Sequence, residues 1–198
     1  MGIRIAGHRT RWAVVVLAVV AATLTGGSAA QAAGPQGGAA AEPRAGVAAW
    51  SSFPQIITNF ASGKCLQPKA AALNALVEQR TCDTTNSLQK WRSEDAGSGF
   101  VRLRNVGSQL CMDLQANSEA EVGNGTLIQV FVCREEYTGE RWMRTAGSRA
   151  QHFQVENFIN TSLCLDVQNR SSSNGALLQL WSCKFIETAQ QFKFTDTF

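Results

Sequence analysis

The sequence has few of the residue patterns that enzymes rely on. Only one of its two histidines, His152, lies beyond the first 32 residues. It contains no glycine-rich phosphate loop and no nucleophile motif. Its acidic residues are scattered, whereas glycosidases need two carboxylates held a set distance apart in a cleft. We therefore expect no catalytic activity and no cofactor.

An excess of charge of either sign is also missing. The formal net charge is +3, but residues 1–32 hold three arginines and no acid, so the remainder has a net charge of 3 − 3 = 0. No block of like charge occurs there. A neutral chain offers no electrostatic attraction to nucleic acid or to an anionic membrane surface. We expect no nucleic-acid partner, and we expect a monomer.

No apolar run is long enough to span a membrane. Three arginines precede the run from Trp12 to Leu24, which reaches Gly26 at most, whereas a span needs roughly 20 apolar residues. Small residues then lead to Ala30-Gln31-Ala32, a pattern typical of a signal-peptide cleavage site. Residues 1–32 are predicted to be a secretory signal peptide. Residues 33–52, rich in glycine, alanine and proline, are predicted to be a flexible leader.

Six cysteines follow the predicted signal, which suits an exported, oxidised protein. Six cysteines can pair in 15 ways, and zinc binding is the rival interpretation, although zinc sites usually have closer Cys-x2–4-Cys spacing. Taken as successive pairs, the gaps are 82 − 65 = 17, 133 − 111 = 22 and 183 − 164 = 19. The pairs predicted from this regularity are Cys65–Cys82, Cys111–Cys133 and Cys164–Cys183, with no metal.

Residues 53–198 show a repeat with a period of about 50 residues. Short alternating apolar runs are separated by Gly, Asn and Ser, a pattern typical of an all-β domain. The second cysteines of the pairs are 51 and 50 residues apart, and so are the aromatic residues nine positions later, Trp91, Trp142 and Phe192. Each unit is long enough for four short strands. Three units can close around a threefold axis, with these three aromatics in the core.

This pattern resembles the ricin B-type lectin family, a β-trefoil whose repeats end in Gln-x-Trp. The corresponding positions here read Gln89-Lys90-Trp91, Glu140-Arg141-Trp142 and Gln190-Gln191-Phe192, and the resemblance covers residues 54–198. It implies one shallow sugar pocket per repeat, built from an Asp, a Gln, an aromatic residue and an Asn immediately before Gln-x-Trp. The carboxylate accepts hydrogen bonds from sugar hydroxyls, and the ring covers the apolar C–H face of the sugar.

The third repeat matches these positions best. The carbohydrate-binding residues carried over to it are Asp166, Gln179, Trp181 and Gln190, with Asn174 in the preceding turn as a secondary contact. In the second repeat the candidates are Asp113, Gln129 and Phe131. The Asn position holds Ala189 in the third repeat and Gly139 in the second, so both depart from the family pattern.

The first repeat lacks the required chemistry, because Gln67, Glu78, Arg80 and Leu88 occupy the Asp, Gln, aromatic and Asn positions. We interpret it as a structural copy without a site.

Other interpretations stay open for the candidate residues and for the whole chain. Asp166 and Asp113 are also placed to accept backbone hydrogen bonds in the turns that follow them. Trp181 also fits an ordinary half-buried aromatic position. The primary prediction is a secreted, extracellular, non-catalytic protein that binds sugars of a polysaccharide or cell surface. The alternative is a protein-binding β-trefoil, such as a protease inhibitor or a partner-recognition subunit, which the loss of the Asn in every repeat favours.

Overall fold

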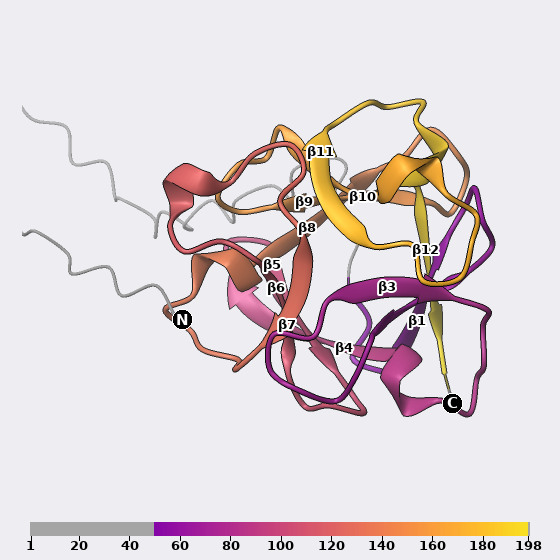
Figure 1. Cartoon of the computed structure of the whole chain (residues 1–198), viewed down its shortest axis with the longest axis horizontal. Helices are drawn as coiled ribbons and strands as arrows, with labels where there is room; N and C mark the ends of the chain where they lie inside the picture. Colours follow the sequence, from indigo (N-terminus) through magenta and orange to yellow (C-terminus); the bar gives the residue numbers. More distant parts are fainter. Residues whose placement is uncertain (1–49, 198) are drawn as a thin grey trace, which may run out of the picture. The chain divides into compact units, whose positions relative to one another are not determined.

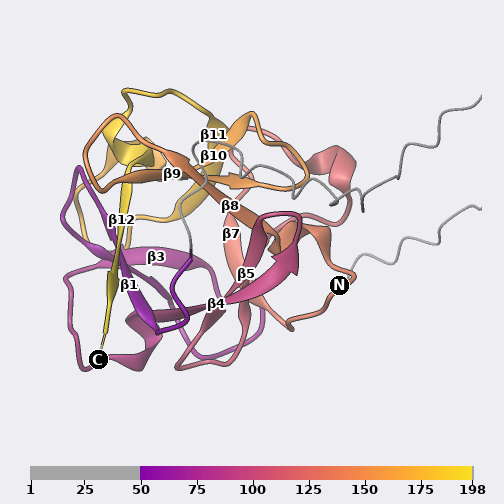
Figure 2. The ribbon, with the colours of Figure 1, turned by 180° about the vertical axis from the view of Figure 1, so that it is seen from behind.

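The computed structural model describes residues 50–197, in which three similar groups of four strands surround a common centre (Figures 1 and 2). The first group contains β1 (Gln55–Asn59), β2 (Cys65–Pro68), β3 (Val77–Arg80) and β4 (Lys90–Gly97). The second contains β5 (Phe100–Asn105), β6 (Cys111–Leu114), β7 (Ile128–Phe131) and β8 (Trp142–Ala146). The third contains β9 (Phe153–Asn157), β10 (Leu163–Val167), β11 (Leu178–Ser182) and β12 (Phe192–Asp196).

Short 3-10 turns connect some of these strands. They are η1 (Ser87–Gln89), η2 (Glu119–Glu121), η3 (Thr138–Glu140), η4 (Gln168–Arg170) and η5 (Thr188–Gln190). Three of them, η1, η3 and η5, come directly before the last strand of a repeat. No helix within residues 50–197 is long and apolar enough to cross a membrane.

The first and last strands of the repeats form a closed barrel. Antiparallel pairing runs from β1 to β4, β5, β8, β9 and β12, and β12 returns to β1. Closure removes the exposed sheet edges that an open arrangement would leave. The two middle strands of each repeat form a hairpin, and isolated bridges such as Leu127↔Gln179 join the three hairpins to one another. This architecture confirms the expected all-β β-trefoil.

The aromatic residues that end the repeats lie in the core, as predicted. Trp91, Trp142 and Phe192 are at most 1% exposed. The indole Nε1 of Trp91 donates to the Leu66 carbonyl at 3.0 Å, and that of Trp142 makes the equivalent bond to Met112. Because a buried indole N–H without a partner would be costly, these bonds let tryptophan occupy the core.

Buried asparagines join each repeat to its neighbour. At the end of the first strand of each repeat the side-chain amide donates to a carbonyl in the 3-10 turn of another repeat. These bonds are Asn59 to Ala189, Asn105 to Leu88 and Asn157 to Gly139, at 2.7–2.9 Å. Each accepting residue is the one just before Gln-x-Trp. The backbone of the position where the family pattern has Asn is therefore fixed, whatever side chain it carries.

The three predicted disulfides are all present. Cys65–Cys82, Cys111–Cys133 and Cys164–Cys183 each join a strand of the hairpin to the segment that follows the hairpin. Since all six cysteines are paired, none offers a thiolate to zinc. The closest group of potential ligands in residues 50–197 places Glu156 beside the sulfurs of Cys164 and Cys183, which are already bonded to each other.

The predicted signal peptide and the leader up to residue 49 lie outside the described residues. The end of the predicted leader contacts the barrel. Trp50 packs edge-on against Phe194 with ring centroids 5.4 Å apart, and the Arg144 guanidinium lies 4.1 Å from the Trp50 ring centroid.

Candidate functional site

Two residues predicted for the third repeat, Asp166 and Gln179, lie side by side on the β10–β11 hairpin. Asp166 lies opposite Gln179 in the register, and Cys164 lies opposite Trp181. Residues two apart on a strand point to the same face, so Asp166, Gln179 and Trp181 share one side of the hairpin. The Gln179 amide donates to Asp166 Oδ1 at 3.0 Å. This bond orients both side chains and leaves the carboxylate further capacity to accept.

A surface hollow of about 530 Å³ lies over this face of the hairpin. Four of the five residues predicted for the third repeat line it, namely Asp166, Gln179, Trp181 and Gln190. Trp181 is 39% exposed, whereas Asp166 and Gln179 are each 6% exposed. A polar floor with a partly exposed ring beside it is what a sugar requires, because its hydroxyls need partners and its C–H face needs an apolar surface.

Burial raises the pKa of the Asp166 carboxyl, although the hydrogen bonds from Gln179 and Gln190 oppose the shift. The ionised form is the stronger acceptor for hydroxyl groups. Protonation at acid pH would therefore weaken any ligand held by this carboxylate, and it would do so at a higher pH than for an exposed aspartate.

Gln190 holds the wall of the hollow in place. It is fully buried; its Oε1 accepts from the Lys184 backbone N–H at 2.8 Å, and its Nε2 donates to the Ser182 carbonyl at 3.1 Å. Both ends of the amide thus clamp the chain around Cys183. Direct contact between Gln190 and a sugar stays a prediction.

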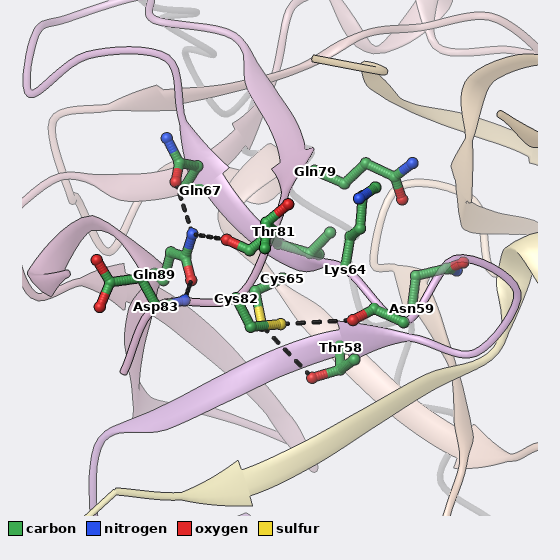
Figure 3. Close-up of a disulfide and its surroundings, with 12 residues drawn as sticks. Thr58, Asn59, Lys64, Cys65, Gln67, Gln79, Thr81, Cys82, Asp83 and Gln89 are labelled. Carbon is green, nitrogen blue, oxygen red and sulfur yellow. Dashed lines mark hydrogen bonds between the residues drawn. A yellow bond between two sulfur atoms is a disulfide. The ribbon is translucent and has the colours of Figure 1, made fainter. Parts of the chain in front are cut away.

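The first repeat uses the same clamp, which Figure 3 shows beside the Cys65–Cys82 disulfide. There the Gln89 amide accepts from the Asp83 backbone and donates to the Thr81 carbonyl and to Gln67. Because this repeat has no aspartate–aromatic pair, the clamp does not depend on a ligand site.

The other positions that would form a site in the first repeat are occupied by an ion pair. Arg80 Nε lies 2.6 Å from Glu78 Oε1, and Glu78 is almost fully buried. The residue opposite Glu78 is Gln67, which is neutral. Because Arg80 already engages the Glu78 carboxylate, this arrangement offers neither a free ionised acceptor nor an aromatic face.

Asn174, the secondary candidate, lies apart from the hollow. Its Oδ1 accepts from the backbone N–H of Thr81 at 2.8 Å, which ties the turn of the third repeat to the first repeat. Asn124 makes the equivalent bond from the second repeat, where its Oδ1 accepts from the Ser182 N–H at 2.6 Å. The two Asn-Gly turns therefore connect repeats.

The second repeat has the same strand register but different surroundings. Asp113 lies opposite Gln129, whose amide donates to Asp113 Oδ2 at 3.2 Å and to the Leu114 carbonyl. The predicted aromatic, Phe131, has the Tyr137 ring beside it with centroids 6.0 Å apart, and it is less exposed than Trp181. The structure thus brings the three predicted residues together, with a smaller free ring surface.

Glu140 replaces the clamp glutamine in the second repeat. Its Oε2 accepts from the Arg134 backbone N–H at 3.0 Å, but its Oε1 is buried without a hydrogen-bond partner among residues 50–197. A carboxylate cannot make the donor bond that Gln89 and Gln190 make. Burial, with a further contribution from the nearby Asp113, raises the pKa of Glu140 to about 8. Burial also raises the pKa of Asp113 to about 6.

The chain matches the family described as the ricin-type β-trefoil lectin domain over residues 53–192. The chain belongs to this family. Membership supports carbohydrate binding in general and confirms the resemblance drawn from the Gln-x-Trp positions. No curated protein matches the chain.

Several solved structures have the same fold as this lectin domain. A designed threefold-symmetric protein, ThreeFoil, is 21% identical, with a TM-score of 0.66 over 73% of this chain and 99% of its own. An exo-β-1,3-galactanase from Clostridium thermocellum is 22% identical, with a TM-score of 0.66 over 74% of this chain and 31% of its own. A ricin B-like lectin from Macrolepiota procera, solved with lactose, is 15% identical, with a TM-score of 0.60 over 76% of this chain and 99% of its own. At these identities the likeness concerns the fold.

Sequence reasoning missed several residues that line the hollow of this lectin domain. They are Gly125, Gln168, Asn169, Arg170, Lys184 and Glu187. Most of them closely follow Asp166 or Cys183, so their nearness in sequence was an available signal. Gly125 comes from the second repeat, and its N–H donates to the carbonyl of Leu180 in the third repeat at 2.9 Å. No local sequence pattern could have placed Gly125 at the hollow.

One wall of the hollow is held by charge and by an unusual backbone. Arg170 Nη2 lies 2.6 Å from Glu187 Oε2. Asn169 and Arg170 have φ values of 57° and 53°, in the left-handed region that non-glycine residues rarely adopt. The ion pair gives the Arg170 side chain a fixed partner on the neighbouring turn, which helps to hold this conformation.

Proposed function

We propose that the chain is a secreted, non-catalytic carbohydrate-binding protein whose principal site is the hollow of the third repeat. The observation that carries the proposal is the arrangement of Asp166, Gln179 and the partly exposed Trp181 on one face of the β10–β11 hairpin. The second repeat has an equivalent pair but a less exposed ring, so it contributes a weaker site. The predicted signal peptide and the three disulfides support export.

The proposal that the site is non-catalytic rests on its carboxylates. Hydrolysis of a glycosidic bond uses two carboxyl groups on opposite sides of the bond. In the hollow, Glu187 is engaged with Arg170 and with the Ala189 N–H, which leaves Asp166 as the carboxylate available to a ligand. One carboxylate beside a ring suits binding.

A single shallow site of this kind should bind a monosaccharide with a dissociation constant in the millimolar range, which corresponds to a binding free energy of about −4 kcal/mol. Useful retention would come from several contacts with one polysaccharide or surface. Galactose-containing sugars deserve inclusion among the first ligands, because two of the similar structures are a galactanase and a lectin solved with lactose.

The test is a glycan array with the mature protein, followed by retention on the best sugar coupled to agarose. Trp181→Ala should abolish retention without loss of folding, because Trp181 lies at the surface. Phe131→Ala, the matched change in the second repeat, should lower retention only slightly. Undiminished retention of the Trp181 variant would refute the site. An empty array together with a stable protein partner from culture medium would favour the protein-binding alternative.

A further inference from the structure

The turn after the second cysteine differs among the three repeats. In each repeat this turn leads from the disulfide into the 3-10 turn, at 83–86, 134–137 and 184–187. The two residues at its tip are Thr84-Thr85 in the first repeat and Glu135-Glu136 in the second. In the third repeat they are Phe185-Ile186. The apolar tip thus occurs in the repeat with the best-formed site.

Phe185 and Ile186 are unusually exposed for their type. They are 60% and 80% exposed, the highest values among the large hydrophobic residues of the described chain. Isolated exposed apolar residues are ordinary, but two adjacent ones at a turn tip form a small apolar protrusion.

Hydrogen bonds hold the backbone of this tip. The Glu187 N–H donates to the Lys184 carbonyl at 2.9 Å, which closes the turn. The Gln191 side-chain amide donates to the Phe185 carbonyl at 3.0 Å, and that of Gln154 donates to the Lys184 carbonyl at 3.2 Å. These bonds fix the backbone with its two apolar side chains exposed to solvent.

The tip stands at the rim of the sugar hollow. Lys184 and Glu187, the residues on either side of Phe185-Ile186, both line the hollow. A ligand seated against Trp181 would therefore leave the tip beside whatever the sugar is attached to.

We propose that the third repeat docks onto a lipid surface that displays sugar headgroups, with the sugar in the hollow and Phe185-Ile186 inserted among the acyl chains. The inference rests on the proposed function of the hollow. Exposed Lys184, next to the tip, can extend its ammonium to the headgroup layer. The two contacts act on one surface, so each strengthens the other.

Two observations favour a lipid surface over a protein partner or a polysaccharide as the structure that the tip contacts. A stable protein interface buries about 800 Å² on each partner, far more than two side chains can supply. A polysaccharide would be covered best by an aromatic ring, yet Ile186, the more exposed of the two, is aliphatic. Hydrocarbon accepts both side chains equally well.

The test compares one sugar on two supports. The best sugar of the array is attached through a phosphatidylethanolamine anchor to phosphatidylcholine vesicles, and separately to agarose. The double variant Phe185→Thr/Ile186→Thr copies the tip of the first repeat, which the same fold already accommodates. It should bind the vesicles at least about tenfold more weakly, equivalent to about 1.4 kcal/mol, and bind agarose like the unmodified protein. The matched control Glu135→Thr/Glu136→Thr should change neither.

The outcomes separate this proposal from the proposed function. If the Phe185/Ile186 variant binds vesicles like the unmodified protein while Trp181→Ala loses both supports, the lipid contact is refuted and the sugar site stands. If the variant also loses agarose, the tip contacts sugar and not lipid. Equal binding of the unmodified protein to bare phosphatidylcholine vesicles would refute the requirement for sugar. If the unmodified protein binds the sugar on neither support, both the lipid contact and the sugar site are refuted.

Discussion

The second and third repeats share a backbone register and a pair of side chains, but the ring beside the pair is more exposed in the third repeat, where a hollow lies over it. Asp113–Gln129 and Asp166–Gln179 lie opposite each other in equivalent hairpins. The differences lie in the residues around each pair. In the second repeat Glu140 replaces the clamp glutamine, and Phe131 is less exposed than Trp181. We infer that the surroundings of the Asp–Gln pair decide whether it can bind a sugar.

Removing a disulfide should give the largest effect. The variants Cys164→Ala/Cys183→Ala and Cys111→Ala/Cys133→Ala open loops of 19 and 22 residues, so each should lose about 3 kcal/mol of unfolding free energy. Denaturant unfolding measures both. At a temperature where both variants stay folded, only the first should lose sugar retention, because Cys164 lies opposite Trp181. Equal retention by the two variants would contradict the assignment of the principal site to the third repeat.

Replacing Glu140 with Gln should stabilise the protein. The folded pKa of Glu140, about 8, is above its ordinary value of 4.5 because of burial. The protonated form is therefore favoured in the folded state, and stability is lost as the pH rises from about 4.5 to 8. At pH 7 the Gln variant should be more stable by about 2–3 kcal/mol, and its stability should vary less with pH. Thermal unfolding between pH 4 and 8 is the measurement.

The reciprocal change is the control for Glu140. Gln190→Glu should introduce the same penalty into the third repeat, because the donor bond to the Ser182 carbonyl is lost and a carboxyl is buried near Asp166. Stability should then fall with rising pH, and sugar retention should fall with it. If Glu140→Gln leaves the pH profile unchanged, the clamp explanation is wrong.

Ala189→Asn should have the smallest effect. It supplies the side chain that the family pattern places beside the pocket, and one added hydrogen bond is worth roughly fivefold in sugar binding, about 1 kcal/mol. Because Ala189 is fully buried, the larger side chain must displace its neighbours, so this gain is an upper limit. Gly139→Asn is the matched change, but a Cβ there would lie 2.6 Å from Asp113 Oδ1, so Asp113 must move. It should not create a comparable site. The affinities are measured by competition with free sugar on the sugar matrix. Unchanged sugar binding by Ala189→Asn would contradict the expected gain.

The features that could be predicted from the sequence are those set by spacing. The cysteine gaps indicated the three disulfides, and the recurrence of Trp91, Trp142 and Phe192 indicated the threefold core, because equivalent positions in a repeat meet equivalent surroundings. The assignment of Asp166 and Gln179 to one pocket followed from the family resemblance. Each of these depends on contacts within a repeat or on its symmetry.

The remaining features depend on packing between repeats and on burial. The placement of Gly125 at the hollow arises from the hairpin of a neighbouring repeat. Gln190 clamps the loop with both ends of its amide, whereas its direct contact with a sugar stays a prediction. The substitution at Glu140 was visible in the sequence, whereas its complete burial was not.

The most direct measurement is a titration of the isotopically labelled protein with the array-selected sugar, followed by nuclear magnetic resonance. We predict that the Trp181 indole N–H, the Gln179 side-chain amide and the backbone of Asp166 shift first, while the signals of Gln129 and Phe131 change only at much higher sugar concentration. Shifts that appear first at Gln129 and Phe131, or at neither hairpin, would contradict the assignment of the principal site to the third repeat.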